Sequence, residues 1–138
     1  MKQVKQMSNG STRQVYDLGN DKILKLAVNN KGLQCNKSEV LTYLVAPAML
    51  RKNLGYIFSY EENYQWLIMK KYTLTLPQND TSLKKVRRLQ QLFRDHGLTP
   101  RDILRKSGPN YNNLRINNKN QIVIIDYGKF INEYNQHL

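Results

Sequence analysis

Cysteine, histidine and long apolar runs are scarce in this sequence of 138 residues, and each scarcity excludes a class of protein. The single cysteine, Cys35, excludes an internal disulfide and a cysteine-rich zinc site. The two histidines, His96 and His137, lie far apart and do not support a metal site. No apolar run approaches the roughly 20 residues that a membrane-spanning helix needs. The first ten residues, MKQVKQMSNG, lack the apolar centre of a signal peptide. We therefore expect a cytoplasmic protein without disulfides and without a membrane partner.

Acidic residues are also few, with 10 Asp and Glu against 22 Lys and Arg, so the formal net charge is +12. This charge predicts attraction to an anionic partner such as nucleic acid, nucleotide phosphates, an acidic protein or a membrane surface. The hydrophobic share of 40% and the nine tyrosines indicate a folded chain of one domain. Basic residues concentrate between residues 84 and 106: Lys84, Lys85, Arg87, Arg88, Arg94, Arg101, Arg105 and Lys106.

The first half of the chain has the pattern of strands interrupted by one helix. A tight-turn sequence, GND, separates two of the alternating segments, as in an antiparallel meander. Val40, Tyr43 and Leu44 fall at helical spacing, and Pro47 marks the end of that helix. We expect strands at 4–7, 13–18 and 22–28, a helix at 36–45, and two more strands within 55–72 around the turn EEN.

The second half begins with an amphipathic helix. The segment DTSLKKVRRLQQLFRDHGL (80–98) carries an apolar stripe and reaches Gly97, a favourable residue for ending a helix. PRDILRK (100–106) predicts a further short helix with Pro100 in its first turn. NLRINN and QIVIID then predict a hairpin. The fold class is therefore α+β, with a strand-rich part at 1–72 and a helix-rich part at 73–138.

The hairpin ends in an unusual way, because four apolar residues, 122–125, are followed directly by Asp126, Tyr127 and Gly128. One interpretation is an ordinary strand end at which the aspartate opens a turn. The other is a carboxylate that faces a cleft and holds a metal ion. The strand pattern alone leaves both interpretations open.

The order of these elements resembles the small lobe and catalytic core of a protein kinase. The sequence is most similar to the short kinase-like proteins encoded by bacteriophages, through GSTRQVYDLG (10–19), LKLA (24–27), NKSE (36–39) and IDYG (125–128). The resemblance extends from about residue 4 to residue 130. It implies a five-stranded antiparallel N-lobe with one helix at 1–72 and a truncated, mostly helical C-lobe carrying a hairpin at 73–138, joined as one compact unit.

The resemblance implies a nucleotide site in the first half. A kinase glycine-rich loop has the form G-x-G-x-x-G-x-V and covers phosphates with its backbone N–H groups. Here SNGSTRQV keeps Gly10 and Val15, while Ser8 and Arg13 replace the outer glycines. Gly10, Ser11 and Val15 would therefore contact ATP. An ordinary hairpin loop is the alternative.

Two charged residues would complete the phosphate site. By the resemblance, Lys25 would bind the phosphates and Glu39, on the following helix, would pair with Lys25 at about 4 Å or less. The alternative is a lysine exposed on the outer face of an edge strand. Met69 would occupy the gatekeeper position, and 70–72, including Lys71, would offer backbone groups to adenine.

The second half would supply the metal ligands. Asn113 aligns with the metal-binding asparagine of the kinase catalytic loop, and Asp126 aligns with the aspartate of Asp-Phe-Gly. An amide and a carboxylate oxygen suit Mg²⁺, which takes few protein ligands. The resemblance thus implies ATP and Mg²⁺ as cofactors.

The catalytic loop departs from the kinase pattern. That loop reads H-R-D-L-x-x-x-N, but Gly108 stands five residues before Asn113, and the nearest carboxylate, Asp102, lies eleven residues before it. Asp102 could orient an acceptor hydroxyl only if an insertion folds away; otherwise it is a first-turn acid of a helix. Ten residues follow Gly128, without an A-P-E segment, so we expect a truncated large lobe.

Three functions remain open. The first is a phosphotransferase that binds ATP and Mg²⁺ and acts on a protein Ser/Thr or another hydroxyl. The second is an inactive pseudokinase that binds a host or partner protein in the cytoplasm. The third, and least favoured, is nucleic-acid binding through the basic helix, whose charges more commonly mark a solvated face.

Overall fold

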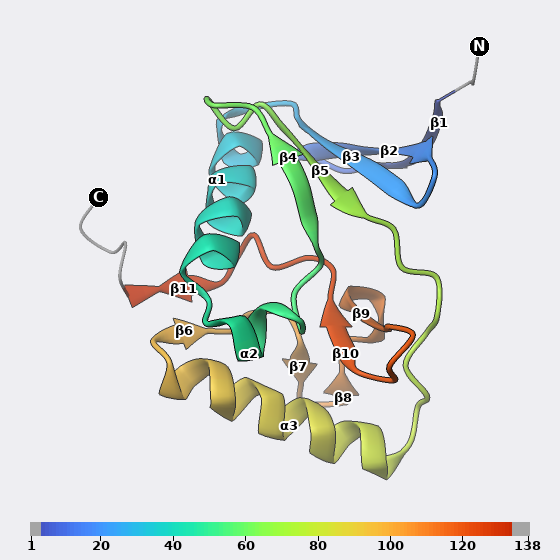
Figure 1. Cartoon of the computed structure of the whole chain (residues 1–138), viewed down its shortest axis with the longest axis vertical. Helices are drawn as coiled ribbons and strands as arrows, with labels where there is room; N and C mark the ends of the chain where they lie inside the picture. Colours follow the sequence, from blue (N-terminus) through green and yellow to red (C-terminus); the bar gives the residue numbers. More distant parts are fainter. Residues whose placement is uncertain (1–3, 134–138) are drawn as a thin grey trace.

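The first half of the chain forms a five-stranded antiparallel sheet, as predicted (Figure 1). The computed structural model describes residues 4–133, so His137 lies outside the described residues. The strand order is β1-β2-β3-β5-β4. The β2–β3 turn places Asn20 and Asp21 in the left-handed region, at φ of 54° and 58°, which is typical of a tight hairpin. The strands are β1 (Lys5–Asn9), β2 (Arg13–Gly19), β3 (Lys22–Ala27), β4 (Ile57–Tyr60) and β5 (Trp66–Lys70).

Two helices, rather than the one predicted, accompany this sheet. Helix α1 (Asn30–Val45) begins six residues before the predicted start, because the Asn29 side chain accepts a hydrogen bond from the Gly32 N–H and caps the helix. The six added residues, NKGLQC, contain a single leucine and therefore show no apolar periodicity. A short helix, α2 (Ala48–Arg51), follows Pro47. Helix α1 packs against β3, β4 and β5.

The long amphipathic helix of the second half is confirmed as α3 (Asp80–Asp95). The Asn79 side chain caps its first turn by accepting from the Ser82 N–H, and Gly97, at φ +77°, ends it. Val86, Leu89 and Phe93 are buried on one side. The helix lies at the opposite end of the molecule from the sheet (Figure 1).

Outside α3, the described second half consists of short strands, turns and loops, so the prediction of a mostly helical C-lobe is wrong. The predicted hairpin is present as β9 (Leu114–Ile116) and β10 (Ile122–Ile124), preceded by a 3-10 turn at Tyr111–Asn113. Two further ladders pair β6 (Leu98–Thr99) with β11 (Ile131–Asn132), and β7 (Leu104–Arg105) with β8 (Gly108–Pro109).

The predicted helix at 100–106 is absent, and the segment instead leads into the β7–β8 hairpin. Asp102 adopts a φ of +63°, a left-handed conformation that a right-handed helix cannot accommodate. The Asn110 side chain donates to the Asp102 carbonyl at 2.9 Å, which closes the hairpin base. The sequence pattern of 100–106 cannot predict this contact, because Asn110 lies outside that segment.

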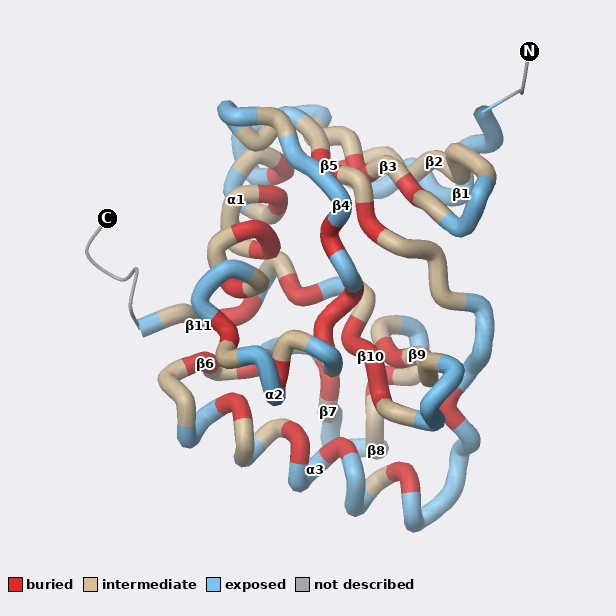
Figure 2. Tube along the Cα trace, viewed as in Figure 1, coloured by how far each residue is buried: buried red, intermediate tan, exposed pale blue. Residues whose placement is uncertain are grey.

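The two halves share one hydrophobic core, visible as buried segments of both in Figure 2. Leu54 and Ile124 form a parallel bridge, with the Gly55 N–H donating to the Ile124 carbonyl at 2.8 Å. The Tyr127 hydroxyl, fully buried, donates to the Gly55 carbonyl at 2.8 Å. In the described part of the chain no helix is long and apolar enough to cross a membrane, and Cys35 is a free thiol.

Candidate functional site

A buried ion pair joins the sheet to α1. Lys25 Nζ lies 3.0 Å from Glu39 Oε1, and the two side chains are 5% and 0% exposed, so the predicted pair is present. Alternation along β3 turns Lys25 away from its neighbours Leu24 and Leu26 and towards α1. Glu39 lies on the buried side of α1 with Asn36.

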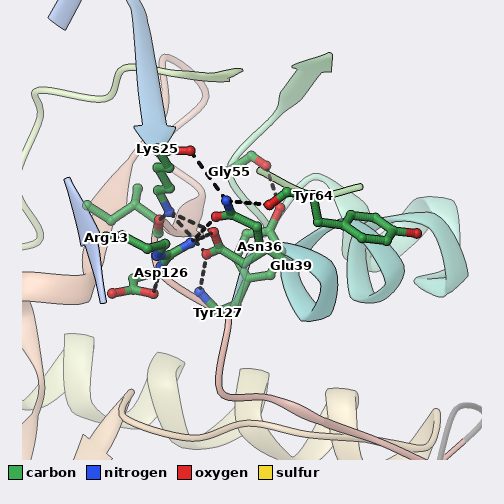
Figure 3. A network of polar contacts seen from close by, with 9 residues as sticks. Arg13, Lys25, Asn36, Glu39, Gly55, Tyr64, Asp126 and Tyr127 are labelled. Carbon is green, nitrogen blue, oxygen red and sulfur yellow. Dashed lines mark hydrogen bonds and ion pairs between the residues drawn. The ribbon is translucent and has the colours of Figure 1, made fainter. Parts of the chain in front are cut away.

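Glu39 is the centre of a larger polar cluster (Figure 3). Lys25 Nζ donates to both of its carboxylate oxygens at 3.0 Å, and the Tyr127 backbone N–H donates to Oε2 at 2.9 Å. A guanidinium, that of Arg13, donates to Oε1. This buried carboxylate therefore has donors from β2, β3 and the segment after β10, which satisfies it without water.

Arg13 is the residue of this cluster whose role the sequence analysis missed. Its Nη1 donates to Asn36 Oδ1 at 3.1 Å as well as to Glu39, and its Nη2 donates to Asp126 Oδ1 at 2.9 Å. The side chain is 10% exposed. A signal was available: Arg13 and Val15 share one face of β2, and Val15 pairs with Lys25. Strand alternation thus places Arg13 on the same face of the sheet as Lys25.

Asp126 lies just beyond β10, at the edge of this cluster. Its side chain is 51% exposed, while the preceding carbonyl, that of Ile125, accepts from Lys25 Nζ at 2.7 Å. Burial acts to raise the pKa of Asp126, but the charges of Lys25 and Arg13 outweigh it, so the pKa lies below its usual value. Asp126 is therefore ionised at neutral pH.

The two cations of the cluster respond differently to burial. Burial lowers the pKa of Lys25, and the attraction of Glu39 compensates only in part. Burial also acts to lower the pKa of Arg13, but Glu39 and Asp126 outweigh it and raise that pKa. Arg13 is thus a permanent positive charge held between two carboxylates.

Asp102 and Asn113 are brought together although eleven residues separate them. The Asn113 side-chain amide donates to the Asp102 carbonyl at 3.0 Å, and the β7–β8 hairpin accommodates the extra residues. Because no helix begins at Pro100, the interpretation of Asp102 as a first-turn helix acid is wrong. The Asp102 carboxylate lies 3.2 Å from Lys129 Nζ. The Ile125 N–H donates to the Asn113 carbonyl at 2.9 Å, so Asn113 adjoins the segment that carries Asp126.

The β1–β2 loop, which contains Gly10 and Ser11, is bound to the start of α1. The Gly10 N–H donates to the Arg13 carbonyl at 3.0 Å, and the Ser11 carbonyl accepts from the Asn29 side chain at 2.9 Å. The Thr12 carbonyl accepts from the Val28 N–H at 2.9 Å. These hydrogen bonds fix the β1–β2 loop to the residues just before α1, and they thereby position the start of β2, which carries Arg13.

The predicted adenine-binding segment is only partly available. Met69 is fully buried in the core. The backbone N–H of Lys70 donates to Tyr56 and that of Lys71 donates to Asp21, at 2.8 and 2.7 Å. Lys71 Nζ also lies 2.7 Å from Asp17 Oδ2. These two backbone N–H groups therefore already have partners, and the contribution of backbone groups of 70–72 to adenine binding stays a prediction.

A divalent metal ion does not fit the site as arranged. The predicted ligands are one side-chain amide and one carboxylate, those of Asn113 and Asp126, and the Asn113 amide nitrogen donates to the Asp102 carbonyl. One oxygen of Asp126 already accepts from the Arg13 guanidinium. A metal ion there would lie beside a fixed positive charge in a partly desolvated site, where repulsion is strong.

Comparison with known proteins supports the fold but goes no further. No family model and no curated protein matches the sequence. Among solved structures, the chain is similar to the Legionella pneumophila Lpg2603 kinase bound to IP6, with a TM-score of 0.53 and 16% identity over 93% of this chain. The match covers 49% of that kinase, so this chain spans about half its length. The fold is therefore kinase-like, while the relation to bacteriophage proteins stays a prediction.

Proposed function

We propose that this chain is a kinase-like protein that binds ATP beside the Lys25–Glu39 ion pair. The observation that carries the proposal is this buried pair at 3.0 Å, with Asp126 next to it. Burial of a lysine and a glutamate contributes little to stability by itself, which favours a functional reason for placing them there. The kinase-like fold provides independent support.

The proposal gives each residue a distinct part in phosphoryl transfer. Glu39 would position Lys25, whose ammonium would exchange its bond to the Ile125 carbonyl for one to the nucleotide phosphates. Asp102 would orient the hydroxyl of the acceptor, a protein Ser/Thr or another alcohol, and Asn113 would hold the Asp102 backbone through the bond at 3.0 Å. The Asp102 carboxylate is 44% exposed, so an acceptor can reach it. Phosphoryl transfer needs such positioning more than covalent participation of the protein.

Nucleotide binding is the first test. A ligand that binds only the folded state raises the unfolding free energy, by about 2.7 kcal/mol at one hundred times its dissociation constant. We expect ATP to raise the thermal midpoint of the wild type. Lys25→Met should weaken binding by about tenfold or more, as for a lost charge-assisted hydrogen bond. Lys84→Met, on the exposed side of α3, is the matched control. An unchanged wild-type midpoint at saturating ATP would contradict the proposal.

The net charge suggests a second probe for the same assay. The kinase that this fold resembles is bound to IP6, a polyanion, and this chain carries a net charge of +12. Stabilisation by IP6 that persists in Lys25→Met would indicate a separate anion site. Stabilisation by IP6 that is lost in Lys25→Met would indicate that ATP and IP6 bind at the same cluster.

Transfer is tested separately from binding. The protein is incubated with ATP labelled at the γ-phosphate and a whole-cell extract, and incorporation into macromolecules is measured. We expect Asp102→Asn to abolish the label while leaving ATP binding unchanged. If the wild type binds ATP but transfers no labelled phosphate, the protein is a nucleotide-binding protein and the proposed phosphotransferase activity is wrong.

A non-catalytic interaction module is the second candidate, and Arg13 is the observation that favours it. An arginine on Asp126 occupies the carboxylate that a kinase would use for metal. In that case the cluster would stabilise the fold and a partner protein would bind elsewhere. This candidate predicts no thermal shift with ATP, and partner capture from extract that Lys25→Met leaves unchanged.

A further inference from the structure

Arg13 and Lys25 differ in the hydrogen-bonding capacity that remains to them. The Lys25 ammonium has three N–H groups, and all of them donate, to the two Glu39 oxygens and to the Ile125 carbonyl. The Arg13 guanidinium has five N–H groups and bonds to three acceptors, Asn36, Glu39 and Asp126. Within residues 4–133, Arg13 is thus the cation of this cluster with donors to spare.

The position of the guanidinium is also fixed before any ligand arrives. Its Nη1 is held from the α1 side by Asn36 and Glu39, and its Nη2 is held by Asp126. The backbone of Arg13 is constrained at the same time, since its carbonyl accepts from the Gly10 N–H. A cation positioned in advance loses little conformational entropy when it binds an anion.

The Asp126 carboxylate is the point at which Arg13 and a divalent ion would compete. Asp126 is half-exposed, so a ligand can approach it, yet one of its oxygens is neutralised by the guanidinium at 2.9 Å. A metal ion at that oxygen would displace the Arg13 Nη2 donor, and a metal ion at the other oxygen of Asp126 would still lie close to the positive guanidinium.

We propose that Arg13 is a second phosphate-binding cation of this site, beside Lys25, and takes the place of a divalent metal ion, so that a nucleoside triphosphate binds without metal. The two remaining guanidinium N–H groups would donate to phosphate oxygens, an arrangement to which the planar guanidinium is well suited. The identity of the ligand, a nucleoside triphosphate, rests on the proposed function. The exclusion of a metal ion from Asp126 is independent of the proposed function.

The first experiment measures ATP affinity by calorimetry in excess EDTA and in excess MgCl₂. For the wild type we expect the two dissociation constants to agree within about threefold. For Arg13→Met we expect affinity in EDTA to fall by about tenfold or more, the loss of a charge-assisted contact, and MgCl₂ to restore part of it. Arg87→Met, on the exposed side of α3, removes the same charge elsewhere and should behave as the wild type. Wild-type binding that requires MgCl₂ would overturn the inference.

A second experiment uses Mn²⁺ alone, detected by electron paramagnetic resonance, and needs no nucleotide. We expect the wild type to bind no Mn²⁺ and Arg13→Met to acquire a site that Asp126→Asn removes in the double variant. If Arg13→Met does not fold, as judged by circular dichroism, Arg13→Gln keeps a hydrogen-bonding group and replaces it. Mn²⁺ bound by the wild type and lost in Asp126→Asn would overturn the inference, as would Arg13 variants that fold but gain no site.

The two experiments also separate this inference from the proposed function. If no protein binds ATP under either condition, the proposed function fails, and the Mn²⁺ result decides whether Arg13 occupies a cation position. If ATP binds the wild type only with MgCl₂, the proposed function stands and the role given to Arg13 fails.

Discussion

At the scale of single residues, Glu39 is the carboxylate on which both buried cations of the cluster depend. Lys25, Arg13 and the Tyr127 backbone all donate to one carboxylate that has no exposed surface. Two of these partners are cations, and both are themselves nearly buried. A charge that is acceptable as part of such a cluster becomes costly once its partner is removed. The cluster therefore depends on the charge of Glu39 as well as on its shape.

We predict that Glu39→Gln lowers the unfolding free energy by about 3–5 kcal/mol, because it leaves Arg13 and Lys25 with less compensation inside the protein. The measurement is urea denaturation followed by circular dichroism. Glu62→Gln, at the exposed β4–β5 turn, makes the same chemical change and should alter stability by less than about 0.5 kcal/mol. A loss below about 1 kcal/mol for Glu39→Gln would show that the cluster is more hydrated than the structure indicates.

At the scale of elements, the contact between the β1–β2 loop and α1 sets the position of Arg13. Gly32, in the first turns of α1, lies directly under this loop. A Cβ at Gly32 would lie 2.1 Å from the Thr12 carbonyl oxygen and 3.1 Å from Ala27 Cα. Both are backbone atoms, which cannot rotate away as a flexible side chain would. The glycine therefore permits the close approach of loop and helix.

We predict that Gly32→Ala destabilises the protein by about 1–3 kcal/mol, the usual cost of forcing an atom into a packed contact. The sign of this change in stability is informative, because helix propensity alone predicts that Gly32→Ala would stabilise the protein by about 1 kcal/mol. Lys31→Ala, at the adjoining exposed position, is the control and should be nearly neutral. Thermal denaturation measures both, and a stabilised Gly32→Ala would mean that the loop moves off α1 at no cost.

At the scale of the whole molecule, the two halves are joined by backbone contacts as well as by a common core. The Ile124 N–H donates to the Asn53 carbonyl and its carbonyl accepts from Gly55, both at 2.8 Å. Leu54, Ile124 and Tyr127 are all fully or almost fully buried. Neither half can retain this packing without the other, so the kinase-like halves are expected to fold together.

We predict a single cooperative unfolding transition for the full chain. Fluorescence of Trp66, the one tryptophan, reports on β5 in the first half, and circular dichroism at helical wavelengths reports largely on α1 and α3. The two midpoints should coincide, as in two-state folding. Ile124→Ala, in the second half, should lower both midpoints together, at a cost of about 2–5 kcal/mol. Separate midpoints would show that the halves unfold independently.

Local features of the sequence were sufficient for most of the elements, and the resemblance to kinases was sufficient for one ion pair. The five strands followed from alternation, and α3 followed from its apolar stripe, because both patterns depend on neighbouring residues. Lys25 and Glu39, which lie 14 positions apart, could be paired because the resemblance to kinases places this lysine on the third strand and its glutamate on the following helix. Periodicity did not predict the early start of α1, because a side-chain cap such as that of Asn29 leaves no periodic pattern. The sequence pattern of 100–106 also predicted a helix that is absent, because the left-handed backbone of Asp102 leaves no such pattern either.

Tertiary structure alone decided what surrounds that ion pair. Arg13 and Asp126 are 113 residues apart, and their contact exists because β2 and the end of β10 converge on the same side of α1. Other tertiary contacts bring Asn113 to Asp102 at the β7–β8 hairpin and give the Lys71 N–H a partner in Asp21. Periodicity reports which side of an element is buried, but it does not report which distant charge will be buried beside it. The free energy of a buried charge is set by that partner, so the chemistry of this site is a property of the folded chain.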